Sequence, residues 1–204
     1  MFLALHQENH QLITSLKKAL SKDGNCFIPQ EHSFLAVDQW RTLNYAISQL
    51  KYKKMRTKNH LKPLSFKISK IKHPKNTDIK NEAIYDVITS IQMRNLIELI
   101  AGINHFLIEK CDCYLCEEGD SLSFPHAPDN FNKCKYIVTF FLDGEYTGGQ
   151  HIVYRSGKKK KYAYRPKSGE MLISSCESSH EIEPITSGKK NMVQAFVQPF
   201  TQAA

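Results

Sequence analysis

Residues 136–142 read Tyr-Ile-Val-Thr-Phe-Phe-Leu, a run of β-branched and aromatic residues that predicts a β-strand. Further short β-rich runs follow between clusters of Gly, Pro, Asn and Asp, at residues 150–154, 161–165, 171–174 and 192–197. Many short strands separated by turn residues are typical of a β-sandwich or barrel. We therefore predict a β-sandwich or barrel over residues 111–200.

The chain before this core has a mainly helical pattern. Apolar residues at helical spacing predict helices over residues 2–20, 38–54 and 81–109. A short strand is expected between Phe66 and Ile71. Helices followed by strands predict an α+β chain, and 204 residues suit one full-sized domain better than two. We expect one domain over residues 1–204, in which residues 1–110 support the β core.

Positive charge is concentrated in one segment. The chain has 28 Lys and Arg against 20 Asp and Glu, and residues 51–80 hold eleven of these bases and one acid, Asp78. Such a cluster attracts polyanions, so it could recruit an acidic macromolecular partner, although it could equally be a solvated, solubilising face.

The sequence also predicts a compartment. No apolar run approaches the roughly 18 residues that a membrane span needs. The N-terminus lacks the basic start and long apolar core of a signal peptide. We therefore expect a cytoplasmic protein whose six cysteines are reduced, with Cys111, Cys113 and Cys116 as buried thiols rather than a zinc site.

Three residues of the β half have side chains suited to a metal. His126 and Asp129 lie in one turn, and His180 follows the strand expected at residues 171–174. Two imidazoles and one carboxylate form the facial triad of non-haem Fe(II) oxygenases, which leaves positions open for other ligands. His151 follows Gly148-Gly149, and we expect it at the surface or facing a substrate rather than on the metal.

Small motifs in a fixed order surround these residues. They are Glu118-Gly119-Asp120, His126 to Asp129, Val138 to Asp143, Gly148-Gly149, Pro166-Lys167-Ser168-Gly169, and His180, Pro184, Gly188 and Lys190. In order and spacing the set resembles the iron(II)- and 2-oxoglutarate-dependent dioxygenases, in particular their prolyl-4-hydroxylase-like branch. The resemblance covers about residues 81–200. It implies a double-stranded β-helix (jelly-roll) core with N-terminal helices packed against it.

The resemblance implies a metal site and a co-substrate site. His126, Asp129 and His180 would bind Fe(II), and Lys190 would bind the far carboxylate of 2-oxoglutarate, with Lys189 as its rival. The family has His-x-Asp where this chain has His-x-x-Asp. A one-residue bulge would bring Asp129 to the metal; otherwise the carboxylate is absent, as in related halogenases. We take Asp129 as a ligand.

Two further residues are implied by the same resemblance. Thr139 would hydrogen-bond the 2-oxoglutarate carboxylate, although a β-branched core residue is equally compatible with this position. Cys116 stands near the place where the family has a tyrosine before the glycine, and Tyr114, two residues earlier, would supply that phenol or be part of the core.

The implied reaction is hydroxylation of an unactivated C–H bond, while 2-oxoglutarate is decarboxylated to succinate and CO₂. It uses Fe(II), 2-oxoglutarate and O₂, with ascorbate as a further candidate. The implied substrate is an amino-acid residue in a peptide, a protein or a small amino-acid-derived molecule. The alternatives are a non-catalytic basic jelly-roll module that binds a polyanion, and a 2-oxoglutarate-dependent halogenase or other oxidase.

Overall fold

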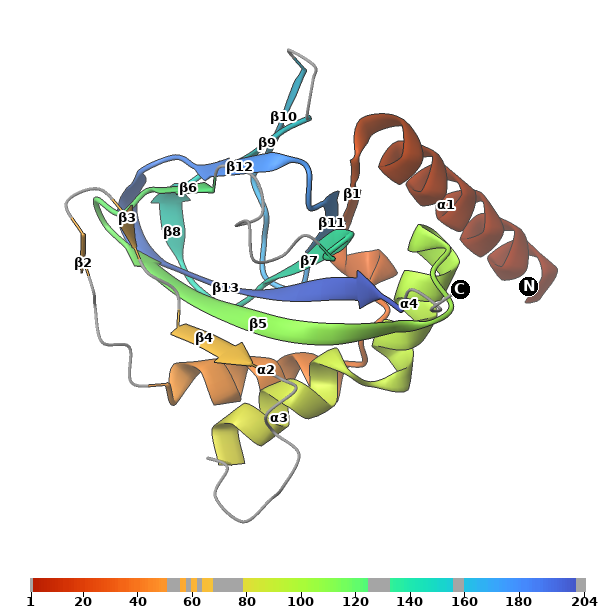
Figure 1. The fold of residues 1–204 in the computed structure, drawn as a ribbon, viewed down its shortest axis with the longest axis horizontal. Coiled ribbons are helices and arrows are strands. Elements are labelled where there is room, and N and C mark those ends of the chain that lie inside the picture. The colour runs from red at the N-terminus through yellow and green to blue at the C-terminus, as the bar shows by residue number, and fades with distance from the viewer. Residues whose placement is uncertain are drawn as a thin grey trace.

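The computed structural model of this chain describes residues 2–50, 56–57, 60–61, 64–67, 79–124, 133–155 and 160–200. Two antiparallel sheets face each other, and helices cover the outer face of the larger sheet (Figure 1). The helices are α1 (Phe2–Asp23), the short 3-10 helix η1 (Gln30–His32), α2 (Val37–Ser48), α3 (Ile79–Ile88) and α4 (Ile91–Ala101). None of the helices in these ranges is long and apolar enough to cross a membrane.

The larger sheet has the strand order β1-β11-β7-β13-β5-β4, and β8 pairs with β13 beside it. Its strands are β1 (Asn25–Ile28), β4 (Leu64–Lys67), β5 (Phe106–Glu117), β7 (Tyr136–Phe141), β8 (Tyr146–Gly148), β11 (Met171–Ser175) and β13 (Ile185–Pro199). The smaller sheet has the order β10-β9-β12-β6. Its strands are β6 (Leu122–Phe124), β9 (His151–Tyr154), β10 (Lys161–Tyr164) and β12 (Ser179–Ile182). A separate pair joins β2 (Arg56–Thr57) and β3 (His60–Leu61).

Alternation along the strands divides the buried side chains between two cores. On β7, Val138 and Phe140 pack against the helices, together with Trp40 of α2 and Met93 of α4. Phe141 points to the opposite face and packs between the two sheets. Successive side chains of a strand point to opposite faces, so the larger sheet has one face for the helices and one for the barrel interior. That interior holds the candidate site.

The fold confirms the predicted jelly-roll core with supporting helices, and it corrects the boundary between them. β1 pairs with β11 and β4 pairs with β5, so two strands from the N-terminal half extend the larger sheet. The short strand expected between Phe66 and Ile71 is described as β4, Leu64–Lys67. The basic residues of segment 51–80 lie largely outside the described residues.

The helix predicted over residues 81–109 is wrong in its extent. The chain forms α3 and α4 with a break at Thr89 and Ser90, where the Ser90 hydroxyl accepts a hydrogen bond from the backbone N–H of Met93. Gly102 ends α4 in the left-handed conformation, with φ of 66°. Residues from Phe106 onward belong to β5. The apolar residues keep a helical spacing across both the break at Ser90 and the start of β5. Periodicity alone therefore did not show where the helix ends and the strand begins.

Candidate active site

The interior face of the smaller sheet brings two histidines together. On β12, His180 and Ile182 are buried, and on β9 His151 and Val153 are buried. The antiparallel register pairs His180 with Val153 and Ile182 with His151. His151 and His180 are therefore diagonal neighbours on one face, a separation that ring side chains can bridge.

The two imidazoles form a hydrogen-bonded pair inside the barrel. His151 Nε2 lies 3.0 Å from His180 Nδ1, and the two rings meet edge to face. His180 Nε2 lies 3.1 Å from the hydroxyl of buried Ser174 on β11. Of the two placements expected for His151, at the surface or facing a substrate, the first is wrong, because the residue is 0% exposed. The site therefore contains a second histidine that the sequence pattern did not assign to it.

Burial keeps both rings neutral. Desolvation lowers the pKa of His180 to about 4. Desolvation also lowers the pKa of His151 well below its usual value, and electrostatic interaction with His180 and then Lys190 lowers it further, because a charge on the His151 ring would be repelled by a proton on His180 or by the Lys190 ammonium. A neutral imidazole keeps a lone pair on one nitrogen, which is the form that binds a metal ion. His180 therefore has the protonation state of a metal ligand.

The other two predicted ligands, His126 and Asp129, lie outside the described residues. β6 ends at Phe124, whose Cα is paired with that of His180. The sequence from Phe124 to His126 and Asp129 therefore continues directly from a position beside His180. Within the described ranges, no three His, Cys, Asp or Glu side chains are grouped closely enough to hold a metal.

Lys190 is a buried cation at the barrel end where β13 meets β8. It is 1% exposed, and its Nζ donates a 2.7 Å hydrogen bond to the carbonyl of Gly149. The same Nζ lies over the rings of Tyr146 and Phe141, at 5.1 and 5.5 Å from their centroids. Desolvation lowers its pKa to about 8. No acidic side chain in the described part of the chain forms a salt bridge with it.

The turn before β9 shapes this end of the site. Gly148 and Gly149 both have positive φ, 71° and 60°, a conformation that residues with a Cβ rarely adopt. A side chain at Gly149 would also collide with Ile185. The two glycines thus allow the tight turn that presents the Gly149 carbonyl to Lys190.

The neighbouring lysine points the other way. Lys189 has a side chain that is 65% exposed, and its Nζ lies 3.2 Å from a carboxylate oxygen of Glu117 on β5. Alternation on β13 therefore turns Lys190 into the barrel and Lys189 toward solvent. Of the two candidates for an internal anion site, only Lys190 has the required orientation.

Tyr114 and Thr139 both face the barrel interior, but they lie at different distances from Lys190 along the strands. Tyr114 on β5 packs with Val153 and Met192 between the sheets, and desolvation raises its pKa well above the usual value. Thr139 is 0% exposed, and its hydroxyl accepts a 3.4 Å hydrogen bond from Gln194, its partner on β13. Gln194 lies four residues along β13 from Lys190, which is about 13 Å in a strand. The register thus separates Thr139 from the anion site at Lys190.

The cysteines divide into two groups. Cys111, Cys113 and Cys116 are buried free thiols, as expected for core residues. Cys134 and Cys176 form a disulfide, with their Cα atoms 6.2 Å apart, so the expectation of six reduced thiols is wrong for this pair. The pair joins the approach to β7 to the turn between β11 and β12.

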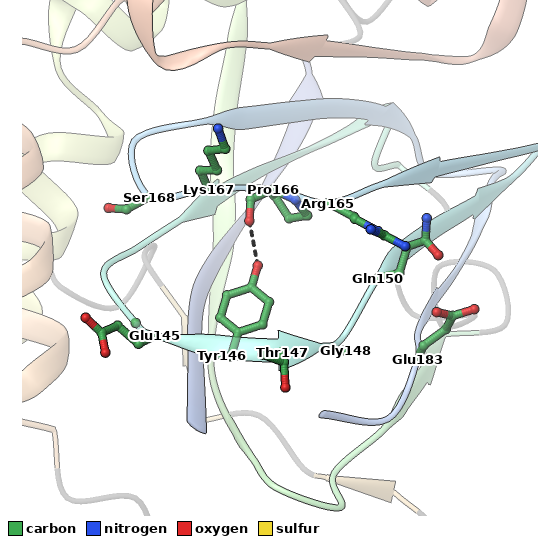
Figure 2. A pocket seen from close by; sticks show the side chains of 11 residues that line it. Glu145, Tyr146, Thr147, Gly148, Gln150, Arg165, Pro166, Lys167, Ser168 and Glu183 are labelled. Carbon is green, nitrogen blue, oxygen red and sulfur yellow. Dashed lines mark hydrogen bonds between the residues drawn. The ribbon is translucent and has the colours of Figure 1, made fainter. Parts of the chain in front are cut away.

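In the described part of the chain, pockets open at opposite ends of the barrel strands. One, of about 660 Å³, lies outside the end that holds Lys190; Figure 2 shows the Tyr146 hydroxyl pointing across it to the Pro166 carbonyl, 2.6 Å away. The other, of about 580 Å³, is lined by Tyr136, Arg155 and Ser178, where β7 and β12 begin and β9 ends. His180 does not line the second pocket, but it follows the lining residue Ser178 by two positions in the chain.

Comparison with known proteins gives a match in structure but not in sequence. No protein-family model and no curated protein sequence matches this chain. A solved structure of an oxidoreductase of the 2OG-Fe(II) oxygenase family from Burkholderia pseudomallei matches with a TM-score of 0.77 and 12% identity, over 91% of this chain and 90% of that one.

Two further solved structures show the range of proteins with this architecture. A prolyl hydroxylase from Trichoplax adhaerens, in complex with a peptide fragment of hypoxia inducible factor, has a TM-score of 0.64 and 16% identity, over 95% of this chain and 92% of that one. An alpha-ketoglutarate-dependent epimerase of nogalamycin biosynthesis has a TM-score of 0.68 and 12% identity, over 93% and 83%. With its facing sheets and supporting helices, this chain has the double-stranded β-helix fold of the iron(II)- and 2-oxoglutarate-dependent oxygenases, the prolyl hydroxylases among them.

Proposed function

We propose that this protein is an Fe(II)- and 2-oxoglutarate-dependent dioxygenase that hydroxylates an unactivated C–H bond, with an amino-acid residue as its substrate. The observation that carries the proposal is Lys190, a cation buried inside the barrel without an acidic partner in the described part of the chain. A buried charge is costly unless an opposite charge compensates it. A dicarboxylate bound in the barrel supplies that charge.

The described residues fit the implied metal and co-substrate. His180 is a buried, neutral imidazole, and Lys190 lies ten residues further along the chain on the next strand of the barrel. His180 would hold Fe(II) together with His126 and Asp129, and Lys190 would hold the far carboxylate of 2-oxoglutarate. When bound, Fe(II) would activate O₂, which is the oxidant, while 2-oxoglutarate would supply two electrons and leave as succinate and CO₂, so that an unactivated C–H bond can be oxidised.

This chain's own residues bind, orient and exclude water. Lys190 forms a charge-assisted hydrogen bond to the co-substrate, and its contact with the Gly149 carbonyl fixes the position of Nζ. The apolar side chains Phe141, Val153 and Leu172 surround the interior and keep it dry. In such a site electrostatic contacts are stronger than in water, because the effective dielectric is low.

The pocket of about 580 Å³, lined by Ser178 just before β12, is our candidate for the substrate site. It lies at the barrel end where β12 begins, and Lys135, Arg155 and Glu177 line it along with serine hydroxyls. Charges of both signs suit the polar backbone and termini of an amino-acid or peptide substrate. The prolyl hydroxylase among the structural neighbours was solved with a peptide, which supports this substrate class.

A different oxidation outcome remains the second candidate, because one structural neighbour with the same fold is an epimerase. The test of the proposal is a titration of 2-oxoglutarate into the Fe(II)-loaded protein without oxygen, followed by an assay for succinate after air is admitted. We expect a visible charge-transfer band on 2-oxoglutarate addition, and succinate formation with oxygen. Absence of both in folded protein would contradict the proposal.

A further inference from the structure

His151 is a buried histidine to which the proposed reaction gives no role. It is 0% exposed, and its hydrogen bond within the described residues is to His180. Its Nδ1 is buried and has no hydrogen-bond partner there. A buried, unpaired polar atom costs free energy of folding, so stability alone favours an apolar residue at this place. Val153, two residues along β9 and on the same interior face, is such an apolar residue.

The hydrogen bond between the rings fixes where the protons are. One of the two nitrogens, His151 Nε2 or His180 Nδ1, must carry a hydrogen and the other a lone pair. If His180 binds a metal through Nε2, its hydrogen is on Nδ1, and His151 Nε2 is the acceptor. Metal-binding histidines nearly always donate their second N–H to a fixed acceptor, which sets the tautomer and the ring orientation. In this chain the acceptor is a second histidine.

Other side chains hold the acceptor in place. The Phe141 ring meets the His151 ring edge to face, with centroids 5.5 Å apart. Backbone pairing of β9 with both β10 and β12 fixes the strand that carries His151. His151 therefore lies on a rigid element, as a residue that must orient another side chain should.

We propose that His151 is a positioning residue, whose Nε2 accepts a hydrogen bond from His180 Nδ1 and so holds His180 in the tautomer and orientation that bind the metal. This inference rests on the proposed function. It assigns His151 no contact with the metal, and it assigns the pair a role before any substrate or oxygen binds.

The experiment compares three variants by direct titration of Mn(II) into metal-free protein, without turnover. Removal of an outer partner of a metal ligand typically costs 10- to 100-fold in metal affinity, so we expect a loss of about that size for His151→Leu. The amide of a glutamine reaches the position of Nε2, so His151→Gln should keep most of the affinity. The shorter amide of an asparagine reaches only the level of Nδ1, so His151→Asn should behave like His151→Leu.

Thermal unfolding of the metal-free variants is the folding control. Leucine adds an apolar side chain to an interior that already contains Phe141, Val153 and Ile182, so His151→Leu should fold. Unchanged Mn(II) affinity in His151→Leu, or equal losses in His151→Gln and His151→Leu, would overturn the positioning role. A wild-type protein that binds neither Mn(II) nor Fe(II) would overturn the proposed function itself, and this inference with it.

Discussion

Replacement of Lys190 by methionine should have opposite effects on ligand binding and on stability. Methionine keeps a long side chain but removes the charge and the hydrogen bond to the Gly149 carbonyl. Truncation of one partner of a buried charge pair costs about 2–5 kcal/mol. Since 1.4 kcal/mol is a factor of ten, the dissociation constant of 2-oxoglutarate should rise at least about 30-fold.

The stability of the ligand-free protein should move the other way. Burial lowers the pKa of Lys190 from 10.5 to about 8, a cost of about 3 kcal/mol for the charged form at neutral pH. The hydrogen bond to Gly149 and the contacts with the Tyr146 and Phe141 rings offset part of it. We therefore expect Lys190→Met without ligand to be as stable as wild type, or more stable by up to about 2 kcal/mol.

The assay is a titration of 2-oxoglutarate into the Mn(II)-loaded protein, with urea unfolding of the ligand-free protein alongside it. Lys189→Met is the matched control, because that side chain is exposed and pairs with Glu117 at the surface, where such a pair is worth about 0–1 kcal/mol. Wild-type affinity in Lys190→Met would refute the reasoning. An equal loss in Lys189→Met would show that the anion site is elsewhere.

Three other outcomes are expected. Alanine at His126, Asp129 or His180 should abolish Fe(II) retention, and a variant that still produces succinate under limiting iron would remove that residue from the ligand set. The affinity for 2-oxoglutarate should fall as pH rises through about 8, where Lys190 of the ligand-free protein loses its charge. The stability of the ligand-free protein should instead rise between about pH 8 and 10.5, because the unfolded chain binds more protons than the folded one in that range. If neither quantity changed with pH, the burial of a charged Lys190 would be contradicted. Glutamine in place of several lysines of segment 51–80 should weaken the binding of a polyanionic partner in a salt-dependent way. The turnover of 2-oxoglutarate should stay close to that of wild type. A collapse of turnover in folded protein would place that segment in the active site.

The sequence predicted where most strands lie better than it predicted which of their side chains face the barrel interior. Runs of β-branched and aromatic residues located β7, β9, β10, β11 and β13. β6 (Leu-Ser-Phe) and β12 (Ser-His-Glu-Ile) were missed because neither contains a run of β-branched or aromatic residues. β1 was missed because Asn25–Ile28 is isolated between two helical segments, and its pairing with β11 depends on tertiary structure.

The same limit explains why His151 was misplaced. Along β9, His151, Ile152 and Val153 are all buried, so the strand shows no alternation of polar and apolar residues. A polar residue at one end of such a run was therefore expected at the surface or facing a substrate. The spacing of His180 and Lys190 was informative, by contrast, because Pro184 and Gly188 lie between them in the order that the family resemblance implies. Which of Lys189 and Lys190 faces inward depended on the register of β13 with β5, which no local pattern gives.

The interior polar residues also bear on the alternative that this chain is a binding module without catalysis. A jelly roll that bound a polyanion on its surface would gain nothing from Lys190, His151 and His180 inside the barrel, where each requires desolvation. Mutations that replaced them with apolar residues would be neutral or stabilising in such a protein. In this chain all three side chains are buried in one interior. A cation can bind a carboxylate and a neutral imidazole can bind a metal ion, so a bound 2-oxo acid and Fe(II) give these groups a role that surface binding does not.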